Sequence, residues 1–169
     1  MRAVCGRAGL TDRYFYENFV DRDALLVAVI EEIRDEGFGL ILEAVLPLLG
    51  GPPVVQLRAA LTAVLEFISA DDDAAQIFFG DHGGSDVLEG LRRELINGVV
   101  EMFIGLIGTR LIDAARLSEL RVMLILGIGG FVETAAAWRA KLIDFSSEEL
   151  VEILIDLSLR VGDGLIALD

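Results

Sequence analysis

The sequence predicts an all-α fold, and three observations support that prediction. Proline occurs only at Pro47, Pro52 and Pro53 among 169 residues, so long segments can continue as helices. Apolar residues recur at intervals of three or four through most of the chain, which is the period of an amphipathic helix. No two alternating segments are joined by a hairpin turn, so we expect no sheet.

The N-terminal segment predicts two short helices. Ala8 and Gly9 are typical of a helix end, and Thr11 is a suitable N-cap for a following helix that is rich in aromatic residues. Two helices joined by so short a turn make a helix-turn-helix pattern. Phe15 and Phe19 are expected to supply its core.

The next 60 residues predict three helices, separated by breakers and caps. A long helix is expected from Asp21 to near Pro47, where two glycines and two prolines follow. A second begins near Val54, and a short third covers 74–79 after the serine and acids of 69–73. The buried stripe of the second helix is expected to comprise Leu57, Leu61, Leu65 and Ile68.

Three further helices are expected in the second half of the chain. Three glycines in residues 80–86 predict a loop, and Ser85 or Asp86 would cap a helix from 87 to about 108. The following helix covers about 117–141. Its core side is expected to contain Leu120, Leu124, Ile128, Phe131 and Ala135.

The last helix is expected over about 147–165, with Ser146 or Ser147 and Glu149 as its capping signal. This helix and the one over about 117–141 each contain more apolar residues than one core stripe requires. We therefore expect both to bury a second face against a symmetry mate as a four-helix homodimer interface, with a larger monomeric core as the alternative.

Several glycines lie inside expected helices, where each costs about 1 kcal/mol relative to alanine. Such positions fit either a close helix crossing, where only hydrogen has room, or a kinked helix beside a ligand cavity. Gly127, Gly129 and Gly130 are the best candidates for a kink.

Composition excludes several classes of protein. Hydrophobic residues make up 54% of the chain, too many for a disordered segment, and a formal net charge of −14 argues against a generally basic nucleic-acid coat. No uncharged apolar stretch approaches the roughly 18 residues of a membrane span, and the first residues lack a signal-peptide core. We expect a soluble, cytoplasmic protein with no membrane partner.

The scarcity of reactive residues argues against metal sites and catalysis. Cys5 is the only cysteine and His82 the only histidine, so neither an intramolecular disulfide nor a Cys/His zinc site is available. We find no Ser/His/acid set, paired catalytic carboxylates or phosphate loop. We therefore expect no enzyme and no cofactor, and we interpret His82 and the acidic run at 70–73 as solvated loops.

Nine positions within residues 4–26 make up a pattern of small residues, a Thr cap, aromatic residues, a basic residue and a Leu-Leu pair: Ala8, Gly9, Leu10, Thr11, Tyr16, Phe19, Arg22, Leu25 and Leu26. In this pattern, residues 4–26 closely resemble the DNA-binding region of the tetracycline-repressor-like (TetR/AcrR) transcriptional regulators. The resemblance implies a partial DNA-binding head over 1–22 and a helical ligand-binding and dimerisation domain over 23–169. The family has one more helix before this motif, so we expect that helix to be missing here.

The short second helix is the expected reader of DNA bases. Its N-terminal residues are Thr11, Asp12, Arg13 and Tyr14. Arg13 is the best candidate to contact guanine, and Tyr14 can meet a thymine methyl or a phosphate. Asp12 repels phosphate unless it accepts from cytosine or caps the helix. The resemblance implies phosphate contacts by Tyr16, Asn18 and Arg22.

Charge is divided unevenly between the two expected domains. Residues 1–22 contain four arginines and three acids, a net charge of +1, while residues 23–169 carry −15. The acidic excess therefore lies away from the expected reading helix. This distribution fits a protein that tolerates DNA only at its N-terminal end and binds it with a shallow salt dependence.

Aromatic and methionine residues on different helices are candidates to line an apolar effector cavity, although most are expected in the core. They are Phe67, Phe78, Phe79, Met102, Phe103, Met123 and Phe131. With operator DNA and a hydrophobic small molecule as partners, the expected function is a ligand-responsive transcriptional repressor. The alternative is a ligand-binding and dimerisation module that does not bind DNA, because the first helix is expected to be missing.

Overall fold

The computed structural model describes residues 2–79, 86–107 and 114–162. These residues form eight α-helices and one 3-10 turn, with no strand among them, so the predicted all-α class is confirmed. The elements are α1 (Arg2–Ala8), α2 (Asp12–Asn18), α3 (Arg22–Val45), η1 (Leu46–Leu48), α4 (Pro53–Ala70), α5 (Asp72–Phe79), α6 (Asp86–Ile107), α7 (Ala114–Arg139) and α8 (Ser147–Gly162).

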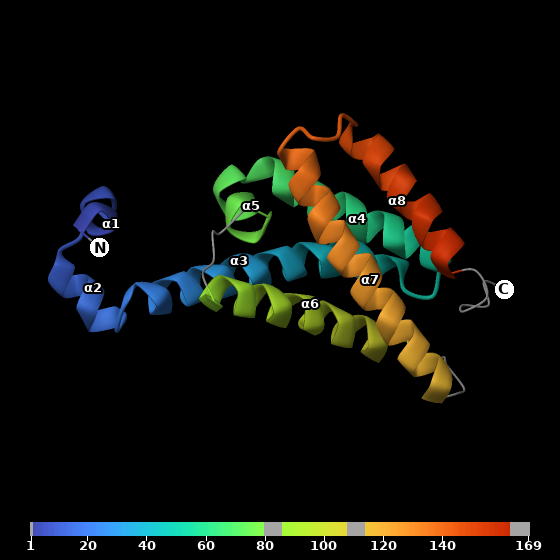
Figure 1. Ribbon diagram of the computed structural model, residues 1–169, viewed down its shortest axis with the longest axis horizontal. Helices are drawn as coiled ribbons and strands as arrows, with labels where there is room; N and C mark the ends of the chain where they lie inside the picture. The colour runs from blue at the N-terminus through green and yellow to red at the C-terminus, as the bar shows by residue number, and fades with distance from the viewer. Residues whose placement is uncertain (1, 80–85, 108–113, 163–169) are drawn as a thin grey trace.

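The long helix α3 connects two unequal parts of the molecule. Figure 1 shows α1 and α2 at its N-terminal end, away from the other helices, while α4, α5 and α6 pack against the rest of α3 and α7 and α8 pack on these helices. Helix α4 packs along α3, α6 packs against α7, and α8 packs against α4. The two parts are called the head (residues 2–22) and the body (the described residues from 23 on).

The main core lies among α4, α5, α7 and α8. Leu65 of α4, Ala75 of α5 and Ala135 of α7 have no exposed surface at all. The cluster consists of Leu65, Ile68, Ala75, Ala135, Leu150, Val151 and Ile155. Apolar stripes on four helices meet there, and their burial is the main source of stability for the body.

Helix α3 contributes less to the core than its apolar period predicts. All of its residues are described, and Ile30 alone is buried. The apolar period of this helix runs through Leu25, Val29, Ile33, Leu40 and Ala44, and of these Leu40 retains 37% of its surface. The reason is tertiary, because α3 is covered mainly by α4 and leaves part of its apolar side open.

Most helix boundaries follow the expected caps. Asp21 caps α3 by accepting from the backbone N–H of Ala24 at 2.8 Å. At α8, Ser146 Oγ accepts from the N–H of Glu149 at 3.2 Å, and the Glu149 carboxylate accepts from the N–H of Ser146 at 2.8 Å. This reciprocal pair is the capping box predicted from the sequence, with Ser146 as the N-cap.

The long helix α3 ends at Val45, near Pro47 as predicted, and Pro47 lies in the 3-10 turn that follows. Two helix starts differ from the prediction: α7 begins at Ala114 rather than at about 117, and α5 also begins earlier. Helix α5 begins at Asp72 rather than Ala74, because Asp71 Oδ1 accepts from the N–H of Ala74 at 2.9 Å and caps the helix earlier. The alternative cap Ser85 lies outside the described residues.

Most of the glycines within helices are not explained by crossings among the described residues. Helix α7 is a continuous α-helix through Gly127, Gly129 and Gly130. A Cβ atom added at any of the three would meet nothing within 4 Å in the described structure. Gly37 does face a neighbour, since such a Cβ would lie 3.6 Å from the ring of Phe67.

Candidate functional site

The head consists of two short helices joined by a tight turn. Helix α1 ends at Ala8, and Gly9 follows it with φ +68°, a conformation in which glycine avoids the strain of a side chain. Leu10 donates its N–H to the carbonyl of Cys5 at 2.9 Å. Thr11 then caps α2, since its Oγ1 accepts from the N–H of Tyr14 at 3.4 Å.

The core of the head is small. Cys5 and Phe15 are buried, with 4% and 6% of their surfaces exposed. The rings of Phe15 and Phe19 lie 5.6 Å apart, yet Phe19 is only half-buried, so the expectation that both are core residues holds fully for Phe15 alone. Val4 and Leu10 remain about half exposed, so this small core leaves apolar surface uncovered.

The expected base-contacting residues lie on the outer side of α2. The Arg13 side chain is 87% exposed and pairs with Glu17 one turn later, with Nε and Oε1 2.8 Å apart. Asp12, in the first turn, lies 3.6 Å from the Arg2 guanidinium. Tyr14 is 52% exposed. A base contact by Arg13 would replace an exposed ion pair that contributes little to stability.

The residues expected to contact phosphates are exposed as well. Tyr16 keeps 61% of its surface. Asn18 donates from Nδ2 to the carbonyl of Tyr14 at 2.8 Å, at the end of α2. Arg22 is the first residue of α3, directly after its N-cap Asp21. The positions expected to contact DNA therefore remain open to a partner, and their roles stay predictions.

The described members of the expected effector-lining set come from three helices, α4, α6 and α7. Phe67 lies between α3 and α4, on the side of Gly37. Phe131 packs against the main core. Met102, Phe103 and Met123 are half-buried on α6 and α7. Phe78 and Phe79 belong to α5, but their side chains lie outside what the structure describes, and His82 lies outside it altogether. An effector site made by these residues stays a prediction.

Two stripes of exposed apolar side chains cover α7 and α8. The α7 stripe is Val122, Ile125 and Leu126, and the α8 stripe is Ile153, Leu157 and Val161, with 37–65% of each surface exposed. Both helices diverge from their connection at 140–146 (Figure 1). Trp138, near that connection, packs against the core, and its Nε1 donates to the carbonyl of Phe145 at 2.8 Å.

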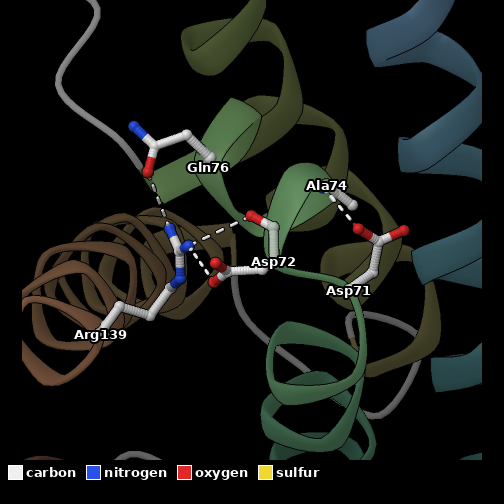
Figure 2. A network of polar contacts seen from close by, with 5 residues as sticks. All are labelled: Asp71, Asp72, Ala74, Gln76 and Arg139. Carbon is white, nitrogen blue, oxygen red and sulfur yellow. Dashed lines mark hydrogen bonds and ion pairs between the residues drawn. The ribbon is translucent and has the colours of Figure 1, made fainter.

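A polar network joins the end of α7 to the start of α5. Figure 2 shows Arg139 reaching from α7 to α5, where Nη2 donates to the Asp72 carboxylate at 2.7 Å and to the Asp72 carbonyl at 3.2 Å. Its side chain is 16% exposed. Gln76 accepts from Nη1 at 3.5 Å. The sequence carries no signal for this network, because its members lie more than 60 positions apart.

Arginine–glutamate pairs join other helices of the body. Arg58 of α4 binds both carboxylate oxygens of Glu152 on α8, and these hydrogen bonds lower the pKa of Glu152. Arg121 of α7 likewise pairs with Glu101 of α6 and lowers the pKa of Glu101. Burial opposes both shifts but is the smaller effect.

Two described helices meet the length and composition of a membrane span: Pro53–Ala70 and, within α7, Leu117–Arg139. Core helices of soluble proteins meet the same criteria, and α4 supplies Leu65 and Ile68 to the core. Only 17% of the residues in each apolar window are buried, however. Much of the apolar surface of α7 is therefore not covered by the described residues. The expectation that the protein has no membrane partner stays a prediction.

Comparison of the chain with models of protein families and with curated proteins found no match in either case. The resemblance of residues 4–26 to the TetR/AcrR head therefore rests on the nine matching positions. Three further observations bear on function: the geometry of the head, the apolar stripes on α7 and α8, and the network around Arg139.

Proposed function

We propose that this chain is a ligand-responsive transcriptional regulator, a repressor, that binds operator DNA as a homodimer through the helix-turn-helix of α1 and α2. One observation carries the proposal. The residues that resemble the TetR/AcrR head form two short helices around a left-handed glycine, with Phe15 buried and the face with Arg13 exposed. Such exposure is what a recognition helix needs to reach base edges in the major groove.

The charge distribution supports the same function. The head, together with Met1, carries +1 and the remainder −15, so only the N-terminal end meets phosphates without strong repulsion. With so few cations, non-specific affinity is weak and specific contacts decide where the protein binds.

The apolar stripes on α7 and α8 support homodimerisation through these two helices. Two copies that are each strongly acidic repel one another unless the charges near their contact are neutralised. Near the α7 stripe Glu133 pairs with Arg92, and beside the α8 stripe Asp156 pairs with Arg160 and Glu152 with Arg58. A dimer of this kind would hold two heads about 34 Å apart, one turn of DNA.

The effector is a hydrophobic small molecule that binds between helices of the body. Half-buried apolar side chains on α4, α6 and α7 are its candidate contacts: Phe67, Met102, Phe103, Met123 and Phe131. The effector would bind more tightly to the dimer with one spacing of the two heads than to the dimer with another. This difference in affinity would shift the dimer between the two spacings and so alter DNA binding.

The DNA-binding test uses the duplex upstream of the protein's own gene and a random-sequence pool at about 0.15 M salt. We expect at least one sequence to be bound about tenfold more tightly than competitor DNA. Arg13→Ala should remove this preference, whereas Arg93→Ala, which removes an exposed charge from α6, should retain it. Uniform binding of all sequences would contradict the proposal.

Light scattering tests the dimer. We expect a mass of twice 18.3 kDa, reduced to the monomer by combining Leu126→Glu with Leu157→Glu. Leu142→Glu is the matched control, because Leu142 is 78% exposed but lies on neither stripe. A wild-type protein that remains monomeric at micromolar concentration would exclude this interface.

A second candidate is a ligand-binding and dimerisation module that does not bind DNA. The half-exposed Val4 and Leu10 favour it, because they leave the small head core uncovered. A dimer by light scattering that prefers no DNA sequence would select this function over the first.

A further inference from the structure

A groove runs along the outer side of α3 and α4, away from the main core. Two adjoining hollows of about 380 and 410 Å³ share Ala44, Ala63 and Glu66, so they form one continuous α3/α4 groove. Leu40 and Val55 stand on its sides, each at least 37% exposed. Small side chains make its floor: Ala44, Ala59, Thr62, Ala63 and Ala70.

The shape of the groove favours an extended occupant. Only α3, η1, α4 and the adjacent Asp71 line it, so one side stays open to solvent. Small-molecule sites bury about 70–90% of their ligand, which a two-helix groove does not do. On α3 and η1 the lining residues run from Glu36 to Leu48 at four-residue intervals, about 18 Å at 1.5 Å per residue. A helix of about three turns matches this length.

The charge of the groove indicates the chemistry of that occupant. Glu36 and Glu66 form no ion pair with any residue that the structure describes, and Asp71 uses one carboxylate oxygen to cap α5. The one lining cation, Arg58, is already bound to Glu152. The uncompensated charge is therefore negative.

On α7 and α8, by contrast, three acids are paired with arginines: Glu133 with Arg92, Glu152 with Arg58 and Asp156 with Arg160. A second copy of this acidic chain at the groove would bring like charges together at low dielectric, at a cost in free energy. A cationic partner would instead gain from Glu36, Glu66 and Asp71 while burying its apolar side on Leu40 and Val55.

We propose that the α3/α4 groove docks an amphipathic helix of a partner protein, with an apolar ridge against the alanine floor and Lys or Arg side chains facing Glu36, Glu66 and Asp71. The docking does not depend on DNA binding or on the apolar stripes. It gives the body an interaction surface separate from the expected dimer face.

The test measures binding of a fluorescently labelled amphipathic peptide of about 14 leucines and lysines to the full chain, by anisotropy at about 0.15 M salt. Ala63→Trp fills the floor without changing charge and should weaken binding about tenfold or more. Ala3→Trp, on the exposed face of α1, is its control. Circular dichroism checks that Ala63→Trp remains helical.

A second pair of variants tests the charges and does not fill the groove. Glu36→Gln with Glu66→Gln should weaken binding at least about fivefold. Glu31→Gln with Glu94→Gln removes the same charge from exposed positions of α3 and α6 outside the groove and should change peptide binding by less than about twofold. Unchanged binding by Ala63→Trp, or equal losses from the two charge pairs, would overturn the proposal.

Discussion

The head and the body bury their side chains to very different extents. In the head, Cys5 and Phe15 are the buried residues, whereas the body has a contiguous cluster of seven joined by four helices. Yet the residues expected to contact DNA all lie in the head or at its junction with α3. The part of the molecule that carries the expected recognition surface is thus the part with the least packing of its own.

This difference teaches that stability and recognition are separated along α3. Free energy from apolar burial is proportional to the area removed from water, so the body holds most of it. Regions with few buried contacts open locally at low free energy. We therefore expect the head to unfold without the body, and the following predictions test that separation in order of decreasing effect on the body.

The largest effect is expected in the core of the body. Leu65→Ala should lower the free energy of unfolding by about 2–5 kcal/mol, because Leu65 is fully buried and a cavity replaces it. Urea unfolding followed by circular dichroism measures this. Leu142→Ala, at a position 78% exposed, should change it by less than about 0.5 kcal/mol. Equal losses of stability from Leu65→Ala and Leu142→Ala would mean that the buried cluster is not the main source of stability of the body.

A smaller loss is expected at the network of Figure 2. Arg139→Gln removes the charged donors to Asp72 and should lower the free energy of unfolding by about 1–2 kcal/mol. Amide exchange in α5 should become faster, because Arg139 holds the start of that helix. Arg160→Gln, which breaks an exposed pair within α8, should cost less than about 0.5 kcal/mol.

The pair between Arg58 and Glu152 should add a pH-dependent contribution that is smaller still, because both side chains are substantially exposed. Folding lowers the pKa of Glu152, so this stability is complete above the ordinary glutamate pKa and is lost as pH falls through the folded value. The urea midpoint of the wild type should therefore be higher than that of Glu152→Gln near pH 7, and the two midpoints should converge as the pH falls below the ordinary glutamate pKa and through the lowered pKa of Glu152.

A matched variant separates this contribution from general charge effects. Glu31→Gln removes an exposed charge from α3, where the described residues offer it no ion pair. The difference in urea midpoint between Glu31→Gln and wild type should not show the pH dependence expected for Glu152→Gln. If the difference in urea midpoint between wild type and Glu152→Gln became larger at lower pH, the predicted direction of the pH dependence would be wrong.

The smallest effect on the body is expected from the head. Phe15→Ala removes the largest buried side chain of the head and should accelerate amide exchange throughout α2. The free energy of unfolding of the body, measured by urea unfolding, should change by less than about 0.5 kcal/mol. A cooperative loss as large as that of Leu65→Ala would mean that head and body fold as one unit.

Much of the secondary structure could be predicted because its signals are local. Asp21 and Ser146 bind backbone groups within three residues, so a cap can be recognised from the sequence alone. The error at α5 has the same origin. Asp71 was one of several adjacent acids, and only the structure identifies it as the cap that starts the helix at Asp72.

The candidate surfaces could be predicted only in part. Period and composition predicted that the helices over 117–141 and 147–165 have apolar residues beyond one stripe, and the exposed Leu126 and Leu157 agree with that surplus. The α3/α4 groove was not foreseen, because an apolar period predicts a buried stripe on α3 and does not indicate how much of it a neighbour covers. The half-burial of Phe19 was not foreseen for the same reason, since the sequence does not indicate how much of its ring neighbouring residues cover.

The sequence by itself determined the all-α class, the position of most helices and the helix end at Ala8 and Gly9, because backbone geometry and capping act over a few residues. Only the tertiary structure decided which stripes meet, that Arg139 joins α7 to α5, and that α3 keeps one side open. These depend on residues far apart in the chain, whose distances are set by how the helices pack, and no local pattern encodes them.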